Sequence, residues 1–206
     1  MPLKPKTTPQ KNYNLLIGRH CLVKSPHFLL GAIQEALAYG ANSLMFHIGA
    51  PQNSSRRALE ELKIPEFKQI LAENKVAENQ VIVHGPYLIN LANATNPKIF
   101  SWSVEFLKKE LIRAEKIGSK TFVLHPGSTL KTPLPTALDQ VVEGLDSVLQ
   151  NEAQIRIALE TMSGKGSEIG TAGYDIKDNL EAVIKEFEEK IGLEKLWVIH
   201  INDSLF

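Results

Sequence analysis

Short apolar runs, each ending in a histidine or a glutamate, are the feature of this sequence that most constrains its fold. Five of the six histidines end such a run, and a further run ends in glutamate. The runs end at His20, His47, His84, His125, Glu160 and His200. If the runs are parallel strands, their carboxyl ends share one edge of the sheet, where α/β folds gather ligands and catalytic groups. Several imidazoles and a carboxylate at one edge predict a metal site.

Helical periodicity fills the segments between the apolar runs. It predicts helices over 28–39, 57–75 with a break at Pro65, 97–117, 135–149 and 178–191. Asn96 and Pro97 supply an N-cap and a proline at the first helical position, and Gly118 ends that helix. The alternation predicts an α/β fold with six parallel strands and right-handed crossovers, either an open doubly wound sheet or a (β/α)₈ barrel.

Length and composition indicate one globular domain, which we expect to span residues 15–206. Residues 1–14 are polar and rich in proline and lysine, which is typical of a disordered tail and not of a signal peptide. The net charge is zero, so no strong basic field indicates nucleic acid, although a local patch can still bind it. Cys21 is the only cysteine, which excludes an internal disulfide and fits a reducing cytoplasm. No apolar run is long enough to span a membrane.

His84 and His125 are the best candidate ligands among the residues that end the runs. Glycine and proline follow each of them, so the strand ends there and the imidazole can project into a cleft. Glu160 also ends an apolar run, where an uncompensated carboxylate is costly and a cation is the simplest remedy. Taken singly, each histidine could bond a loop carbonyl, Glu160 could pair with an arginine or lysine, and the residues after His200 could form a turn. Four equivalent positions together favour a metal.

Other residues near the runs permit more than one interpretation. His20 can line the floor of a barrel or bind phosphate, and His47 can face either way. The 49–57 loop carries amides, hydroxyls and two guanidinium groups, and the 163–167 loop is rich in glycine. Either loop could cradle phosphates through backbone N–H groups or be an ordinary solvated loop. Tyr87 could stack on a base, wedge into a duplex or cover the rim of the sheet.

Taken in order, these stretches resemble the endonuclease IV family of zinc-dependent apurinic/apyrimidinic (AP) endonucleases. The matching segments are 49–54, 84–90, 125–128, 158–166, 172–175 and 200–204. The resemblance implies a TIM-type barrel with three zinc ions at the carboxyl ends of the strands. It also implies a cytoplasmic DNA-repair enzyme in which zinc-activated water cleaves the phosphodiester 5′ to an abasic site in double-stranded DNA, leaving a 3′-hydroxyl.

The same resemblance assigns roles to single residues. The implied metal ligands are His84, His125, Glu160 and His200, and the implied DNA-contacting residues are Gln52, Asn53, Arg56 and Tyr87. Glu160 is implied to be the catalytic carboxylate, bridging the zinc of His84 and His125 to a second zinc held by His200. Tyr87 is implied to enter the DNA at the lesion.

This chain departs from the family pattern in two places. Between Gly170 and Thr171 the family has a further helix and a strand that ends in a ligand segment, and beyond the position of Phe206 it has further ligands on a final strand. We therefore expect an incomplete barrel of six strands, about one zinc, and impaired cleavage. Two alternatives remain open. One is a catalytically dead remnant with one zinc site and weak DNA binding; the other is a metal-dependent sugar isomerase of the same barrel type, which the 49–53 and 125–128 segments disfavour.

Overall fold

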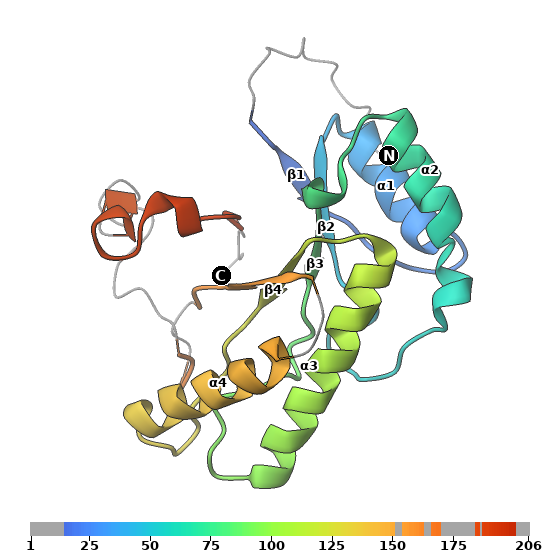
Figure 1. Cartoon of the computed structure of the whole chain (residues 1–206). Helices are drawn as coiled ribbons and strands as arrows, with labels where there is room; N and C mark the ends of the chain where they lie inside the picture. The colour runs from blue at the N-terminus through green and yellow to red at the C-terminus, as the bar shows by residue number, and fades with distance from the viewer. Residues whose placement is uncertain (1–14, 151–153, 163–165, 170–183, 186, 201–206) are drawn as a thin grey trace.

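The computed structural model describes residues 15–150, 154–162, 166–169, 184–185 and 187–200. Five parallel strands in these residues form one sheet in the order β1-β2-β3-β4-β5 (Figure 1). The strands are β1 (Gly18–His20), β2 (Ser43–Phe46), β3 (Val81–His84), β4 (Thr121–Leu124) and β5 (Arg156–Leu159). The helices are α1 (Phe28–Ala38), α2 (Ile64–Glu73), α3 (Pro97–Ile117) and α4 (Leu134–Leu149), with 3₁₀ turns η1 (Leu59–Leu62), η2 (Glu78–Gln80) and η3 (Leu193–Lys195). Each strand pairs with the next one along the chain, as in the wall of a (β/α) barrel.

The hydrophobic core lies between the sheet and the helices that connect its strands. β2 and β4 are buried along their whole length, as expected for central strands of a parallel sheet that is covered on both faces. Phe46 of β2 meets Phe67 of α2 edge to face, with 6.1 Å between the ring centroids. Figure 1 shows α1 and α2 side by side next to β1 and β2, with α3 and α4 below them. This packing leaves the carboxyl ends of the strands free for a site.

Helix α3 begins and ends where the sequence predicts. The Asn96 side chain accepts hydrogen bonds from the backbone amides of Lys98 and Ile99 at 3.1 and 3.3 Å. Gly118 takes a left-handed φ of +105° directly after the last helical residue. The expected 57–75 helix splits into η1 and α2, because Lys63 between them has a left-handed φ of +60°.

One expected strand is absent. Residues 196–200 are described but carry no regular secondary structure, so the described residues contain five strands and not six. An apolar run becomes a strand only where a neighbouring backbone pairs with it, and Trp197 and Ile199 remain 43% and 59% exposed. The expected 178–191 helix is described only at 184–185 and 187–191, and it is helical at 184–185 and 187–190. The rest of that helix, the expected tail at 1–14 and residues 163–165 of the glycine-rich loop lie outside the described residues.

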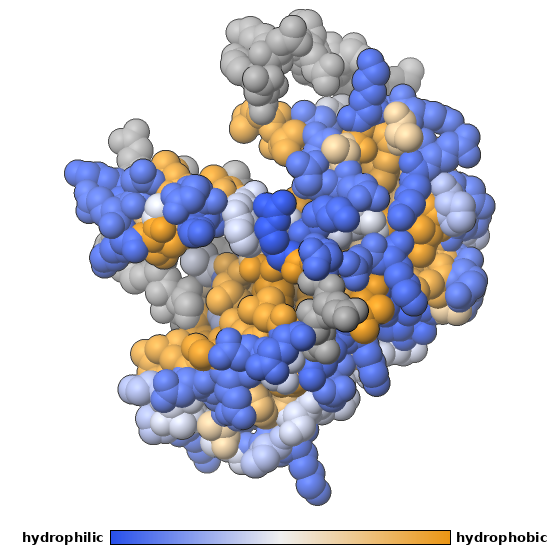
Figure 2. Space-filling view, in the orientation of Figure 1, coloured by the Kyte–Doolittle hydropathy of each residue, from blue (hydrophilic) through white to orange (hydrophobic). Residues whose placement is uncertain are grey.

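The sheet is open within the described part of the chain, since β1 and β5 each pair with one neighbour. This agrees with the expectation of an incomplete barrel. Apolar surface is uncovered around β5 and α4 (Figure 2), and Leu138, Val142 and Leu159 are among the exposed side chains there. In a complete barrel the next strand and helix would pack at such an edge. None of the described helices has the length and apolar character needed to cross a membrane.

Candidate metal centre

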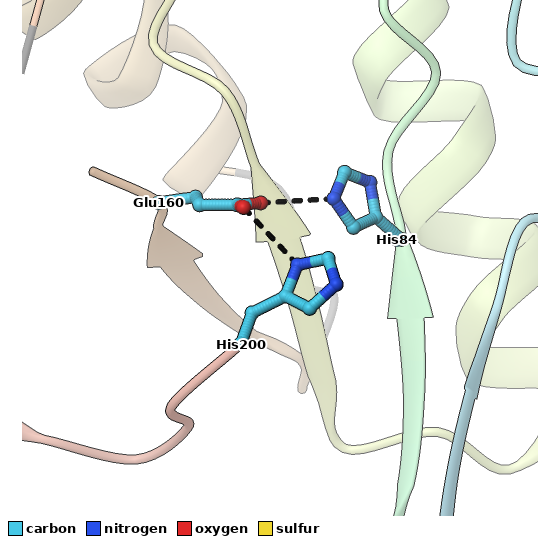
Figure 3. A group of neighbouring side chains, drawn as sticks. All are labelled: His84, Glu160 and His200. Carbon is cyan, nitrogen blue, oxygen red and sulfur yellow. Dashed lines mark hydrogen bonds and ion pairs between the residues drawn. The ribbon is translucent and has the colours of Figure 1, made fainter. Parts of the chain in front are cut away.

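Four side chains expected to act together meet at the carboxyl edge of the sheet. His84 is the last residue of β3, and His125 and Glu160 directly follow β4 and β5. The Glu160 amide donates to the Leu124 carbonyl at 3.0 Å, which fixes the start of the loop beside β4. His200 approaches from the irregular C-terminal segment and points at the same carboxylate (Figure 3).

Glu160 is the centre of this group. Its Oε2 atom lies 2.9 Å from Nε2 of His84 and 3.1 Å from Nε2 of His125. Its Oε1 atom lies 3.1 Å from Nδ1 of His200. One potential ligand atom from each of His84, Glu160 and His200 lies within 4.8 Å of the others. One oxygen of the carboxylate therefore faces the imidazoles of His84 and His125, and the other faces that of His200.

The surroundings keep Glu160 ionised. Burial opposes ionisation, but hydrogen bonds from His125, His200 and His84 outweigh it and hold the pKa of Glu160 well below its usual range. The bond to Glu160 in turn raises the pKa of His200. The site therefore holds a permanent negative charge among imidazoles.

The hydrogen bonds of His84 indicate that a cation belongs here. Nδ1 of His84 lies 2.8 Å from the Gly85 carbonyl oxygen, and Nε2 lies 2.9 Å from Glu160. Both oxygens are acceptors, yet a neutral imidazole has only one N–H. Either His84 is protonated, or Nε2 shares a metal ion with the carboxylate while Nδ1–H donates to the carbonyl, as is usual for metal-binding histidines. Two ligands of one tetrahedral zinc lie about 3.3 Å apart, so this donor set fits zinc.

His20 and His47 also belong to the cluster, a point that the sequence left open. The His47 ring centroid lies 5.0 Å from that of His20 and 4.6 Å from that of His84. Nδ1 of His47 lies 3.0 Å from the His84 carbonyl oxygen, so Nδ1 carries the proton and Nε2 keeps its lone pair. Burial and the imidazoles of His84 and His20 lower the pKa of His47 to about 3. The sequence indicated this role only through their position, since His20 and His47 each end an apolar run as His84 does.

Tyr87 stands over these imidazoles. Its ring centroid lies 5.3 Å from that of His125, 5.4 Å from that of His47 and 6.0 Å from that of His84. The side chain is half exposed, and a cavity of about 340 Å³ opens between it and the loop after β4. The cavity is lined by Tyr87, Ile89, Asn90, His125, Gly127, Ser128, Met162 and Glu168. Tyr87 can therefore reach a ligand that enters the site from solvent.

The 49–57 loop borders the site on the side of Tyr87, whose amide donates to the Pro51 carbonyl at 3.0 Å. Gln52 and Asn53 are exposed on this loop. Arg56 differs, because its side chain is only 9% exposed and pairs with Glu110 of α3 at 2.9 Å. The sequence did not single out Glu110, because one glutamate in a helix gives no sign that it faces inward.

Comparisons with known proteins agree with this architecture. The family model described as xylose isomerase-like TIM barrel matches residues 33–206. The probable endonuclease 4 of Pediococcus pentosaceus is 38% identical over 219 residues, covering 92% of this chain and 73% of the relative. That of Geobacillus kaustophilus is 40% identical with the same coverage. The alignments extend over more positions than the 206 residues of this chain, so the relatives contain residues without a counterpart here.

Solved structures support the fold. Endonuclease IV from Thermus thermophilus superposes with a TM-score of 0.71 at 24% identity, covering 86% of this chain and 72% of that one. A D-tagatose 3-epimerase-like protein superposes with a TM-score of 0.56 at 15% identity, covering 75% and 56%. The barrel type is thus shared with sugar epimerases, but the sequence relatives are nucleases. The chain belongs to the endonuclease IV family of nucleases, within the xylose isomerase-like TIM barrels.

Proposed function

We propose that this chain is an AP endonuclease that acts on double-stranded DNA at abasic sites, and that its cleavage is slow. Cleavage falls 5′ to the abasic site and leaves a 3′-hydroxyl. The observation that carries the proposal is the Glu160 carboxylate, held by three imidazoles at the carboxyl edge of a parallel sheet. It occurs in a chain that is 38% identical to a probable endonuclease 4.

The donor set supports one well-ligated zinc. His84 and His125 face the same oxygen of Glu160, and two imidazoles, one carboxylate and a water make a tetrahedral site. Among the described residues only His200 bonds to the other oxygen, so this part of the chain offers a second ion fewer ligands than the first. Zinc supplies Lewis acidity toward a phosphoryl oxygen, while the chain's own residues orient the phosphodiester and exclude competing water. We expect about one zinc per chain.

Slow cleavage follows from this metal content. In phosphodiester hydrolysis at multi-metal sites, separate ions stabilise the attacking and the leaving oxygen. A site with one ion lacks charge where it develops in the transition state. DNA binding should be less affected, because phosphate contacts come from loops and do not require the metal. Gln52, Asn53 and Tyr87 are the residues we propose for contact with DNA, with Arg56 beside them.

The decisive assay is nicking of a duplex that contains one abasic site, in the presence of zinc. We expect slow nicking that is absent from an unmodified duplex and from the Glu160→Gln variant, and a product that a DNA polymerase extends from its 3′-hydroxyl. Nicking at the rate of a longer relative would contradict the proposed impairment. Turnover of a free ketose with no preference for abasic DNA would instead favour a sugar isomerase.

Metal content gives an independent test. Elemental analysis should return about one zinc per chain, and His84→Ala should lose it. His27→Ala is the matched control, because His27 lies at the start of α1 and outside the histidine cluster. Three tightly held zinc ions, or unchanged zinc in His84→Ala, would contradict the assignment.

A further inference from the structure

The 49–57 loop is held by α3 through an ion pair that is almost completely removed from solvent. Nε of Arg56 lies 2.9 Å from Oε1 of Glu110, and the two side chains are 9% and 2% exposed. The Arg56 guanidinium also lies over the Phe106 ring, 5.0 Å from its centroid. Phe106 and Glu110 are one helical turn apart on α3, so both present their side chains to the same loop.

Arg56 also organises the loop from within. Its Nη1 atom donates to the Asn53 carbonyl at 2.9 Å and to the Ser55 carbonyl at 2.8 Å. A Cβ at Gly49 would lie 3.1 Å from this Nη1 atom, so the glycine makes room for the guanidinium. A second arginine of α3, Arg113, donates to the Arg57 carbonyl at 2.6 Å. The loop is therefore fastened to α3 at its last two residues, and Arg56 ties the carbonyl groups of Asn53 and Ser55 to that anchor.

Glu110 is the charge on which this arrangement depends. Burial lowers the pKa of Arg113, Glu110 opposes that shift, and Arg56 adds to it. The buried Glu110 carboxylate thus favours the charged form of Arg113 as well as pairing with Arg56, and Glu60 adds to its effect on Arg113. Without the charge of Glu110, the Arg56 guanidinium, which is 9% exposed, would lose its carboxylate partner, and an uncompensated buried charge is costly.

The fastened loop reaches the histidine cluster through one hydrogen bond. The Pro51 carbonyl accepts the Tyr87 amide at 3.0 Å, and the Tyr87 ring lies over the imidazoles of His125 and His47. Contacts therefore run without a gap from Glu110 through Arg56 and the loop backbone to Tyr87.

We propose that Glu110 and Arg56 are a positioning pair, which holds Gln52, Asn53 and Tyr87 at the rim of the histidine cluster in the arrangement that binds DNA. Arg56 then acts mainly through the loop and not as a phosphate contact. The part of the inference that concerns DNA rests on the proposed function, whereas the part that concerns the loop does not.

The test uses two variants of the full chain and one control. Glu110→Gln removes the charge and keeps the shape. The double variant R56M/E110L replaces the ion pair with apolar groups, an exchange that is often neutral for stability, but it removes the donors to Asn53 and Ser55. Glu105→Gln is the control, because Glu105 lies on the same helix, is exposed and pairs with Lys108 at 3.1 Å.

Hydrogen exchange reports on the loop without DNA. In both variants we expect faster exchange in 49–57 and at the Tyr87 amide, with protection of α3 unchanged and zinc content equal to that of the control. Loop exchange equal to that of Glu105→Gln in both variants would overturn the proposal. If the double variant is more stable than Glu110→Gln and its 49–57 loop still exchanges fast, the pair positions the loop and does not merely stabilise the fold.

The affinity for a duplex with one tetrahydrofuran abasic analogue shows how much the position of the loop contributes to DNA binding. Re-ordering two or three side chains on binding weakens affinity by about tenfold, so we expect this loss in Glu110→Gln with an unchanged salt dependence. If Arg56 instead contacts a phosphate directly, the double variant will lower the slope of affinity against salt by about one while Glu110→Gln binds normally, which would overturn the proposal. A wild-type chain without preference for the abasic duplex would defeat the proposed function, and the exchange experiment would still decide the positioning role.

Discussion

Gly127, two residues after His125, should be among the residues of this molecule that tolerate substitution least. Its φ is +112°, a conformation that side chains with a Cβ rarely adopt. A Cβ at this position would lie 2.9 Å from Cγ and 3.1 Å from Cα of Asn90. Asn90 cannot move freely, because its side chain accepts from the Ser128 and Ala92 amides at 3.1 and 3.0 Å and donates to the Ser128 carbonyl at 3.0 Å.

The expected cost of Gly127→Ala follows from these contacts. The strained backbone costs about 1–3 kcal/mol. Displacing Asn90 breaks three hydrogen bonds, each worth about 1 kcal/mol. We therefore expect the free energy of unfolding to fall by about 4–6 kcal/mol.

Urea unfolding of three variants can separate the two contributions. Gly40→Ala is the control for backbone strain, since Gly40 has a φ of +73° and an added Cβ there would meet nothing within 4 Å, and it should cost about 1–2 kcal/mol. In an Asn90→Ala background the clash with the Asn90 side chain is removed and only the 3.1 Å approach to Cα remains, so Gly127→Ala should cost clearly less than in the wild-type chain. An equal cost of Gly127→Ala in both backgrounds, or a cost no larger than that of Gly40→Ala, would refute the steric argument.

Three further predictions concern single side chains. Asn96→Ala should lower the free energy of unfolding by about 1 kcal/mol through loss of the α3 cap, and Asn96→Asp should restore it in urea titrations. Cys21 is 1% exposed and burial raises its pKa to about 11, so iodoacetamide at pH 8 should label it only in denaturant; rapid labelling of the native chain would contradict this burial. Ser119→Ala should cost about 1–3 kcal/mol in urea unfolding, because the buried hydroxyl accepts from the Thr121 amide and has the carbonyl oxygens of Val81 and Thr121 within reach of its one hydrogen; a neutral effect would mean that water replaces it.

The sequence predicted correctly those helices and strands whose ends are set by residues at the ends themselves. Helix α3 matches residue by residue, because Asn96, Pro97 and Gly118 set its ends through their own backbone and side-chain chemistry. The strands β1 to β5 were also confirmed, since each is an apolar run with a parallel neighbour. The run that ends at His200 has the same composition but no such neighbour among the described residues, so the strand assignment there was wrong. Pairing is a property of two segments, and one segment cannot reveal it.

The sequence predicted the residues of the candidate site whose place at the end of a strand fixes the direction of the side chain. His84, His125 and Glu160 end or directly follow their strands, and the shared edge of a parallel sheet brings them together. His20 and His47 remained open because the residue types around them do not fix which way the ring turns. Glu110 was missed altogether, since only the packed structure shows that this glutamate is 1% exposed and faces Arg56.

The bond between His200 and Glu160 ties the last described residue to the loop after β5. His200 belongs to a segment that has no strand pairing within the described part of the chain. This bond and the packing of Arg156 on Trp197, 5.3 Å from the ring centroid, join the segment to β5 and the loop after it. A zinc held by His84, His125 and Glu160 would fix the carboxylate to which His200 bonds, so thermodynamic linkage would hold this segment more firmly as the zinc concentration rises. At a hundred times the dissociation constant this amounts to about 2.7 kcal/mol. Chelation should accordingly turn 196–200 into a preferred site of proteolytic cleavage while β1 to β4 stay resistant.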